Sequence, residues 1–401
     1  MRWALRHLSF VLLLLRSEQT FSLAISASPE RQWSRAVAGE APPQRAARLQ
    51  GHREHQARQK ARRLARLDSL LDCVDDALGS EWAPSSALAP ACGVYDVAWS
   101  TLPSGCDPCM ASAKMRPGTQ RGERKRESIS AMAWLLETRL LAQINSTAPT
   151  IVDAGCGTGS LLLPLAAIFP HVTFVGVDMK AGSLERLKKR AAEAGSDVAS
   201  RVIAWHGRIE EYDQACDGLV SLHACGGASD SALSLAAERQ VPFAVSPCCV
   251  GKLRRGPASS WLREIVQRKE DASSGGESAV FALMAAWADS EHVLAAAAAP
   301  SVQRAGGAPL SGASDTPDME DDDAHAEVAK RTAAAHLVAA MRRRRCKTLV
   351  EVDRLMAVSE LRASREGGSE TAPRRYGELL RITGDAMATS AQTELLAGPV
   401  L

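Results

Sequence analysis

The chain has 401 residues and a formal net charge of +2, because 48 Lys and Arg residues are almost balanced by 46 Asp and Glu residues. This length suits one large domain or two smaller ones, and the charge balance excludes a polycation that coats nucleic acid along its whole length. Aromatic residues make up 4% and cysteines number ten, which argues against broad base-stacking surfaces and a disulfide-dense secreted module. No apolar run reaches the roughly 18 to 20 residues of a membrane-spanning helix.

The N-terminal region has the composition of targeting segments. Residues 1–26 resemble a signal peptide, since a basic start is followed by the apolar run Leu8–Leu15 and then by small residues. Residues 27–71 are basic and rich in Ala and Gln, which predicts either a transit peptide or a helical arm that stays on the mature protein. Together they predict import into an organelle, a plastid or another, through the secretory route. The alternatives are the cytoplasm or the secretory pathway itself.

Residues 72–122 are rich in Pro and Cys and are predicted to form an irregular linker. Cys106 and Cys109 form a Cys-x-x-Cys pair, which suits either two zinc ligands or two reduced thiols in a loop. A structural zinc site needs four ligands, and Cys73 and Cys92 do not complete a recognisable spacing. The pattern therefore favours reduced thiols.

Residues 125–385 alternate between short apolar strands and segments of helical length, which predicts one α/β domain. Strands are expected at 150–153, 172–178, 201–205, 218–222 and 241–245, with helices at 127–145, 159–168, 181–194 and 229–238. Such alternation implies parallel βαβ units with right-handed crossovers, hence a Rossmann-like, doubly wound, mostly parallel sheet. In the helix at 181–194, Lys188, Lys189 and Arg190 are predicted to face water.

The C-terminal part of this domain is less regular. Residues 295–325 combine alanine runs with an acidic cluster, which predicts a disordered insertion. A helix is expected to resume near Glu327 and to end in Arg342–Arg345, whose charges suit a solvated face better than a phosphate contact. A last strand is expected at 376–383, and residues 386–401 are expected to be a tail.

A glycine-rich loop is the most specific motif. Asp153-Ala154-Gly155-Cys156-Gly157-Thr158-Gly159 stands between a predicted strand and a helix. Glycines there permit positive φ and let the backbone approach a ligand closely. A dinucleotide site needs GxGxxG or GxGxxA, but position 160 is Ser. The pattern D-x-G-x-G-x-G instead resembles motif I of class I S-adenosylmethionine-dependent methyltransferases, whose cofactor has no pyrophosphate.

A second acid supports this resemblance. Asp178 ends the next strand, where a carboxylate can accept hydrogen bonds from both ribose hydroxyls. The same acid would suit NAD, so an NAD-dependent oxidoreductase is a rival that Ser160 disfavours. The resemblance implies S-adenosylmethionine as cofactor, held by a set at the ends of the first two strands: Asp153, Gly155, Cys156, Gly157, Gly159 and Asp178. The stretch 207–210 departs from many relatives, which place an acid or polar residue near the adenine.

Two further segments follow the fourth and fifth predicted strands and should flank the cofactor cleft at the carboxyl ends of the strands. They are His223-Ala224-Cys225-Gly226 and Pro247-Cys248-Cys249. The pair resembles the methyltransferase-like domain of the glutathione S-transferase C-terminal-domain-containing proteins. More distantly it is similar to tRNA 2′-O-methyltransferases with His-x-Cys-Gly and Cys-Cys segments. The resemblance covers roughly residues 128–251, and it implies methyl transfer to an unknown acceptor. The candidates are RNA, with tRNA as the first example, a protein and a small molecule.

The candidate catalytic residues are His223, Cys225 and Cys248. His223 suits a general base at neutral pH, or a loop-ordering group that binds backbone. The cysteines suit packing or substrate shaping, a metal site with His223, or a thiolate nucleophile; packing is favoured, and no metal is predicted. The rival from another class is a catalytically silent module that binds RNA or a protein partner. The intact acid–glycine–acid set favours the enzyme.

Overall fold

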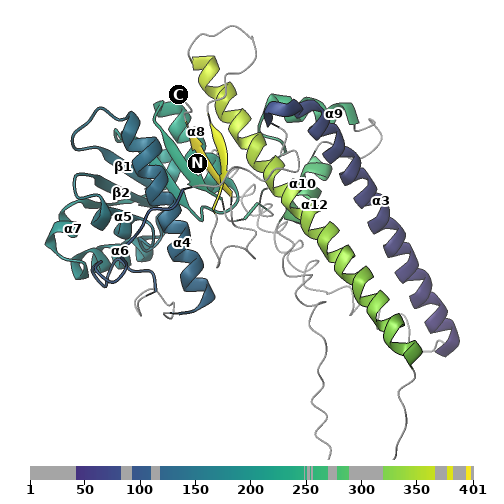
Figure 1. Cartoon of the computed structure of the whole chain (residues 1–401). Coiled ribbons are helices and arrows are strands. Elements are labelled where there is room, and N and C mark those ends of the chain that lie inside the picture. Colours follow the sequence, from purple (N-terminus) through teal and green to yellow (C-terminus); the bar gives the residue numbers. More distant parts are fainter. Residues whose placement is uncertain are drawn as a thin grey trace, which may run out of the picture. The chain divides into compact units, whose positions relative to one another are not determined.

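The computed structural model describes residues 42–82, 93–109, 118–247, 249–250, 253, 256–269, 278–288, 319–365, 377–382 and 394–398 (Figure 1). The signal-like segment 1–26 lies outside these residues. The chain divides into two units, Met1–Arg66 and Leu67–Leu401. No helix within the described ranges is both long and apolar enough to cross a membrane.

Helix α3 (Pro42–Trp82) contains the described part of the first unit and enters the second. Between 47 and 66 its side chains are exposed except for Arg48 and Leu64, which are half-buried. Its last turns differ, because buried side chains at helical spacing pack into the second unit: Leu67, Leu70, Leu71 and Val74. Residues 72–82 are therefore helical, and the expectation of an irregular segment there was wrong.

The second unit contains one seven-stranded sheet, which confirms the predicted Rossmann-like fold. The strand order is β3-β2-β1-β4-β5-β7-β6, and β1 to β5 run parallel. The strands are β1 (Thr150–Ala154), β2 (Thr173–Asp178), β3 (Val202–His206), β4 (Gly218–Leu222), β5 (Phe243–Ser246), β6 (Glu378–Arg381) and β7 (Glu394–Gly398). The order reverses between β1 and β4, so a ligand cleft is expected beyond their carboxyl ends.

Strand β7 lies in the segment that the sequence analysis expected to be a tail. It runs antiparallel between β5 and β6, and Leu396 and Ala397 are buried. An apolar pattern of five residues is too short to be recognised as a strand from the sequence alone. Pairing with β5 and β6 makes this segment a strand.

Helices cover both faces of the sheet and alternate strand residues face them. Ile151 belongs to a buried cluster with side chains of α4, α5 and α6, whereas Val152 belongs to a second cluster with side chains of α8, α9, α10 and α12. The helices are α4 (Gln120–Leu135, continued by a π-helical turn Leu136–Leu140), α5 (Leu162–Ile168), α6 (Ala181–Glu193), α7 (Ser196–Ser200), α8 (Gly227–Arg239), α9 (Ser260–Lys269), α10 (Ser278–Ala288) and α12 (Met319–Arg365). Residues 93–109 are irregular, as expected, but pack on the α4 side through Trp99, Leu102 and Cys106.

Helix α12 begins inside the segment predicted to be disordered. Residues 319–325 are therefore helical, and the expectation of disorder was wrong for them. Farther along, Arg342 pairs with Asp68 and Arg345 with Asp72, at 2.6 and 3.0 Å. Two of the four cations at 342–345 therefore bind acids of α3 instead of facing only solvent.

Candidate functional site

The glycine loop connects β1 to α5, and its three glycines have positive φ. The φ values are 77° at Gly155, 57° at Gly157 and 80° at Gly159, a region that L-residues with a side chain rarely adopt. A Cβ on Gly159 would lie 2.4 Å from Leu187 Cδ1, so this glycine also permits close packing of α6. A Cβ on Gly157 would meet no atom within 4 Å, which leaves its backbone open to a ligand.

Asp178 ties the end of β2 to this loop. Its Oδ2 accepts a hydrogen bond from Gly157 N at 2.9 Å, and its Oδ1 accepts one from Lys180 N at 2.8 Å. Each carboxylate oxygen has a second lone pair, so the predicted role toward ribose hydroxyls is compatible with both bonds. Met179 follows at once and is 63% exposed, an apolar side chain at the rim of the site that the sequence analysis missed.

Asp153 lies beneath the loop with a carboxylate that is only partly satisfied. The residue is 1% exposed, and its Oδ2 has no hydrogen-bond partner. Burial raises the pKa of Asp153 to about 7; Lys125 opposes this rise, and the charge of Asp178 adds to it. A buried, unpaired carboxylate oxygen is costly, so this position suits a cationic or hydrogen-bond-donating ligand group.

Arg190 of α6 stabilises the glycine loop by binding its backbone. Its guanidinium is buried and donates to Thr158 O at 2.7 Å and to Gly105 O at 2.9 Å. The prediction that Arg190 faces water was wrong, because it follows Leu187 by three residues on the buried face of α6. The carbonyl acceptors replace the water that an exposed guanidinium would bind.

Cys156 packs within the loop. A Cβ on Gly176 of β2 would lie 2.8 Å from its Sγ, so the strand glycine makes room for the thiol. Burial raises the pKa of the Cys156 thiol well above its usual range. Cys156 therefore fills space beneath the site and is not a thiolate.

His223 follows β4 beside the glycine loop. A Cβ on Gly155 would lie 3.8 Å from the Cβ of the next residue, Ala224. His223 has φ 67°, an uncommon value that clusters at functional sites, and its N–H donates to Ser246 O at 3.1 Å. Burial, together with smaller contributions from the charges of Lys125 and Arg121, lowers its pKa to about 3. The imidazole is therefore neutral at pH 7 and a weak proton acceptor as it stands.

The cysteines that were predicted near the acceptor differ from one another in exposure. Cys225 is exposed, and its Sγ lies 3.5 Å from His223 O, to which it donates. Cys248 lies outside the described residues. Cys249 is half-buried, and its backbone oxygen accepts from Gly226 N at 3.2 Å, which joins the two segments.

Helix α4 brings two cations, Arg121 and Lys125, to the histidine. They are four residues apart and therefore share one face of the helix. The basic run 121–126 was visible in the sequence, but no local signal placed it beside the end of β4.

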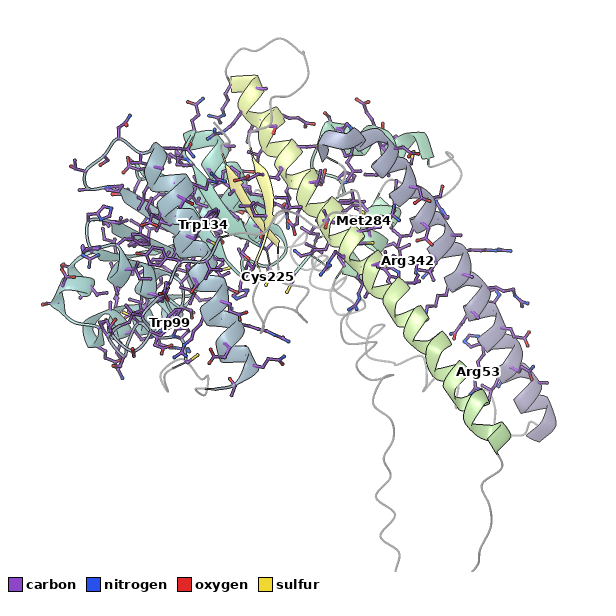
Figure 2. The ribbon with its side chains drawn as sticks, viewed as in Figure 1. Arg53, Trp99, Trp134, Cys225, Met284 and Arg342 are labelled. Carbon is purple, nitrogen blue, oxygen red and sulfur yellow. The ribbon has the colours of Figure 1, made fainter. Side chains whose placement is uncertain are left out.

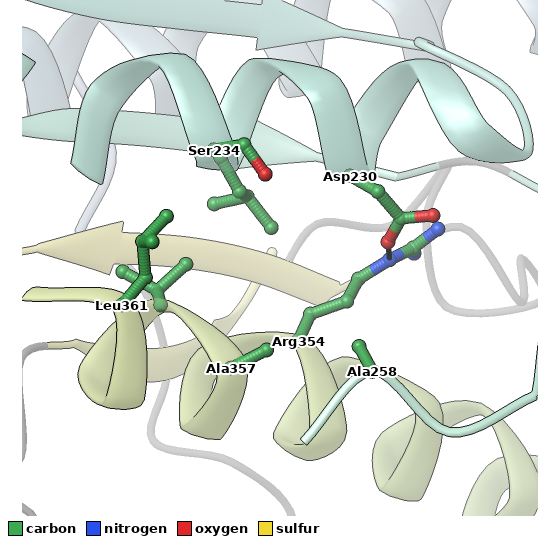
Figure 3. A pocket seen from close by; sticks show the side chains of 8 residues that line it. Asp230, Ser234, Ala258, Arg354, Ala357 and Leu361 are labelled. Carbon is green, nitrogen blue, oxygen red and sulfur yellow. Dashed lines mark hydrogen bonds and ion pairs between the residues drawn. The ribbon is translucent and has the colours of Figure 1, made fainter. Parts of the chain in front are cut away.

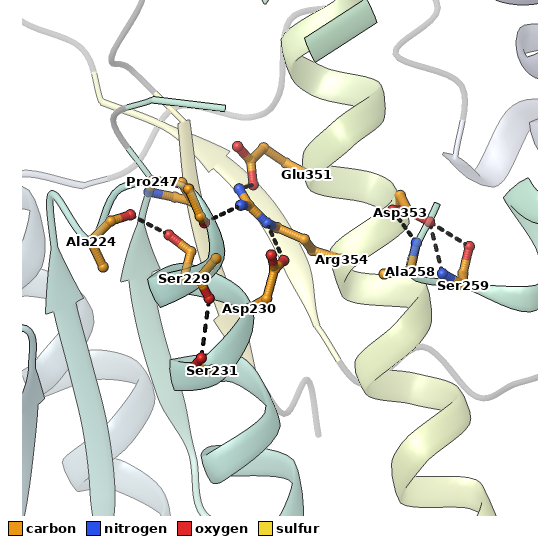
Figure 4. A network of polar contacts seen from close by, with 12 residues as sticks. Ala224, Ser229, Asp230, Ser231, Pro247, Ala258, Ser259, Glu351, Asp353 and Arg354 are labelled. Carbon is orange, nitrogen blue, oxygen red and sulfur yellow. Dashed lines mark hydrogen bonds and ion pairs between the residues drawn. The ribbon is translucent and has the colours of Figure 1, made fainter. Parts of the chain in front are cut away.

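Buried charged residues of α12 bind the backbone of the two segments that follow β4 and β5, residues 223–226 and 247–249 (Figure 4). The sequence analysis missed these charges. Glu351 is fully buried and binds Lys347 Nζ at 2.5 Å and Arg354 at 2.8 Å. Arg354 also binds Asp230 at 2.8 Å and donates to Gly226 O at 3.0 Å. Lys347 donates to Pro247 O at 2.8 Å. The charges therefore fix the backbone at the carboxyl ends of β4 and β5.

A hollow between α8 and α12 lies beside the ion pair of Asp230 and Arg354 (Figure 3). Leu233, Val358 and Leu361 give it mostly aliphatic walls. Its two charged lining residues, Asp230 and Arg354, bind each other at 2.8 Å, so their charges are already paired within the protein.

The Cys106 and Cys109 pair is buried, and burial raises the pKa of Cys106 to about 11. Arg126 binds the intervening Asp107 at 2.6 Å, which helps to order this loop. Within the described ranges, no three His, Cys, Asp or Glu side chains gather closely enough to hold a metal ion.

Comparison with known proteins shows what the central segment resembles. A family model described as a methyltransferase domain matches residues 124–256. A glutathione S-transferase C-terminal domain-containing protein homolog of Drosophila pseudoobscura pseudoobscura is 31% identical over 169 residues, 42% of this chain and 27% of the relative. The ribosomal RNA small subunit methyltransferase G of Chlorobaculum tepidum is 32% identical over 90 residues, 22% of this chain and 40% of the relative.

One solved structure is an S-adenosylmethionine-dependent methyltransferase from Geobacter sulfurreducens with S-adenosyl-L-homocysteine, 24% identical. The structural match spans 30% of this chain and 47% of the chain in the solved structure, with a TM-score of 0.24. The first curated relatives are much longer, and the match spans only 26 to 27% of their length. The resemblance to class I methyltransferases and to the glutathione S-transferase C-terminal-domain-containing proteins is confirmed for the central segment of the chain.

Proposed function

We propose that the chain is an S-adenosylmethionine-dependent methyltransferase whose acceptor is RNA. The observation that carries the cofactor assignment is the unpaired Oδ2 of Asp153 beneath the positive-φ glycine loop. A buried carboxylate with a pKa of about 7 suits a cation better than it suits solvent. The methionine end of S-adenosylmethionine carries an ammonium and a sulfonium, so the chemistry of the site fits that end of the cofactor.

The remaining residues of the loop fit the rest of the same molecule. Gly157 leaves its backbone uncovered, as a loop that approaches a ligand requires. Asp178 would hold the ribose hydroxyls with its unused lone pairs, and the exposed Met179 would cover one face of the adenine. When bound, the cofactor supplies an activated methyl group, and the protein supplies position and charge.

An anionic acceptor would change the behaviour of His223. Burial is the main reason for its low pKa, but Arg121 and Lys125 contribute. An RNA phosphate that binds these two cations would offset their effect, and the pKa of His223 would rise. The histidine would then accept the proton of a hydroxyl more readily with RNA bound than without it. The name of the Chlorobaculum tepidum relative, a ribosomal RNA methyltransferase, also supports RNA.

A catalytically silent module is the second candidate. The pKa of about 3 at His223 favours it, because a histidine with so low a pKa is too weak a base to take a proton from a hydroxyl efficiently. This module would still bind the cofactor through Asp153 and Asp178, but would not transfer a methyl group to any RNA.

Calorimetric titration of S-adenosylhomocysteine into the full chain, with NAD as control, tests the cofactor assignment. We expect micromolar binding of S-adenosylhomocysteine and none of NAD. Asp178→Ala should weaken binding by about 1.5–3 kcal/mol, the range for a hydrogen bond to a charged group. Binding that is unchanged in this variant would contradict the site.

Transfer of a labelled methyl group to total RNA then separates the enzyme from the silent module. Incorporation that His223→Ala abolishes, with cofactor affinity retained, supports the enzyme. Cofactor binding without incorporation into RNA, protein or small molecules supports the silent module.

For the N-terminal region we propose organelle import with cleavage ahead of α3. Leu67, Leu70 and Leu71 belong to the core of the second unit, so cleavage after residue 71 would remove buried side chains. The N-terminal sequence of the mature protein, purified from its source, tests this position. A first residue beyond Pro42, where α3 begins, would contradict it.

A further inference from the structure

Helix α3 contains a strongly basic stretch outside the methyltransferase unit. Between 47 and 66 the only acid is Glu54, against seven Arg and Lys residues. Five of these cations are exposed and have no ion pair within the described ranges: Arg53, Arg58, Lys60, Arg62 and Arg63. Figure 2 shows Arg53 on this helix. We call these five the α3 cations.

The α3 cations lie around the whole circumference of the helix. At about 100° per residue, Arg53 and Lys60 share one side, Arg58 and Arg62 lie roughly opposite, and Arg63 lies between. Arg58 and Arg62 also form a like-charged pair at i, i+4, which destabilises an isolated helix. A partner with negative charge would relieve this repulsion.

The helix lacks the apolar stripe of a membrane-surface helix. Leu49 and Leu64 are the only large apolar side chains between 47 and 66, and at 1.5 Å per residue they are about 22 Å apart. A helix that lies in a membrane surface needs a continuous apolar face as well as a basic one. Charge without such a face favours a polyanion, whose phosphates can approach from several sides.

We propose that residues 47–66 of α3 form an arm that binds the phosphate backbone of RNA. The choice of RNA rests on the proposed function, whereas the need for a polyanion follows from the α3 cations alone. The contacts are to phosphates, so the arm would contribute affinity and little sequence preference.

The test compares two full-length variants that lose the same charge. In the arm variant, Arg58, Arg62 and Arg63 are changed to Gln, which is uncharged and forms helices well. In the control, three exposed cations of α6, Arg186, Lys188 and Lys189, are changed to Gln. Binding of a fluorescein-labelled RNA hairpin is measured by anisotropy at several salt concentrations. Circular dichroism and S-adenosylhomocysteine binding show that each variant is folded.

The arm variant should bind RNA on the order of tenfold more weakly, with a salt slope reduced by roughly 2 to 3. The control should bind like wild type. Equal losses in both variants, or no loss in either, would overturn the proposal. So would anionic phospholipid vesicles that displace the RNA.

Failure of the proposed function gives a different pattern. RNA binding that depends on the arm, in a protein that does not bind S-adenosylhomocysteine, would support the arm and reject the cofactor site. A mature chain that begins after Arg66 would overturn both the arm and the proposed cleavage position, and would leave the cofactor site unaffected.

Discussion

Replacing Asp153 by Asn removes a buried charge while keeping the shape of the side chain. Because Asp153 is buried, its pKa rises from 3.8 to about 7 in the folded protein. The stabilisation linked to its proton is complete below about pH 4 and is lost as the pH rises through 7. Ionised Asp153 therefore costs the ligand-free protein about 4 kcal/mol at pH 8. An uncharged amide at this position carries no such penalty, so Asp153→Asn should be more stable than wild type at pH 8.

Urea unfolding of both proteins at pH 5 and pH 8 measures this difference. Relative to wild type, Asp153→Asn should gain roughly 2–3 kcal/mol between the two pH values. A parallel change of stability in the two proteins would refute the argument from burial, because it would mean that Asp153 is solvated in the folded state.

The ionised form of Asp153, which destabilises the ligand-free protein, should favour cofactor binding. If ionised Asp153 holds a cationic group, affinity for S-adenosylmethionine should rise on the order of tenfold between pH 5.5 and 7, and Asp153→Asn should lose both affinity and pH dependence. Calorimetry over this range avoids the titration of an α-amino group near pH 8. A variant that is more stable yet binds as well as wild type would place the cofactor elsewhere.

Three other predictions follow from the geometry of the site. Gly159→Ala should lower the free energy of unfolding by roughly 2–4 kcal/mol, and Gly157→Ala by about 1 kcal/mol, because both have positive φ but only the first Cβ meets a packed side chain; urea unfolding compares them. Glu351→Gln leaves two buried cations without their shared carboxylate and should destabilise by about 3–5 kcal/mol in thermal unfolding, whereas an unchanged protein would show that the charges are hydrated. A thiol reagent should label exposed Cys225 well before buried Cys106, whose pKa is about 11; mass spectrometry of native protein gives the order, and the reverse order would contradict the burial.

The sequence by itself determined the sheet and the glycine loop. Alternation of apolar strands and helices has a period that can be read locally, and it predicted β1 to β5 as parallel strands of a Rossmann-like sheet. The positions of Asp153, Gly155 and Asp178 follow from the same pattern, because a loop after a buried strand must lie at the carboxyl edge of the sheet.

Only the tertiary structure decided what surrounds that loop. Lys347 binds Pro247 across 100 positions of sequence, and Arg354 binds Gly226 across 128. Strand β7 likewise exists through its pairing with β5 and β6. Such contacts leave no periodic signal in the sequence around either partner, because the two partners come close only when the chain folds. The low pKa of His223, set by burial and by two cations from another helix, belongs to the same class and was beyond the reach of the sequence.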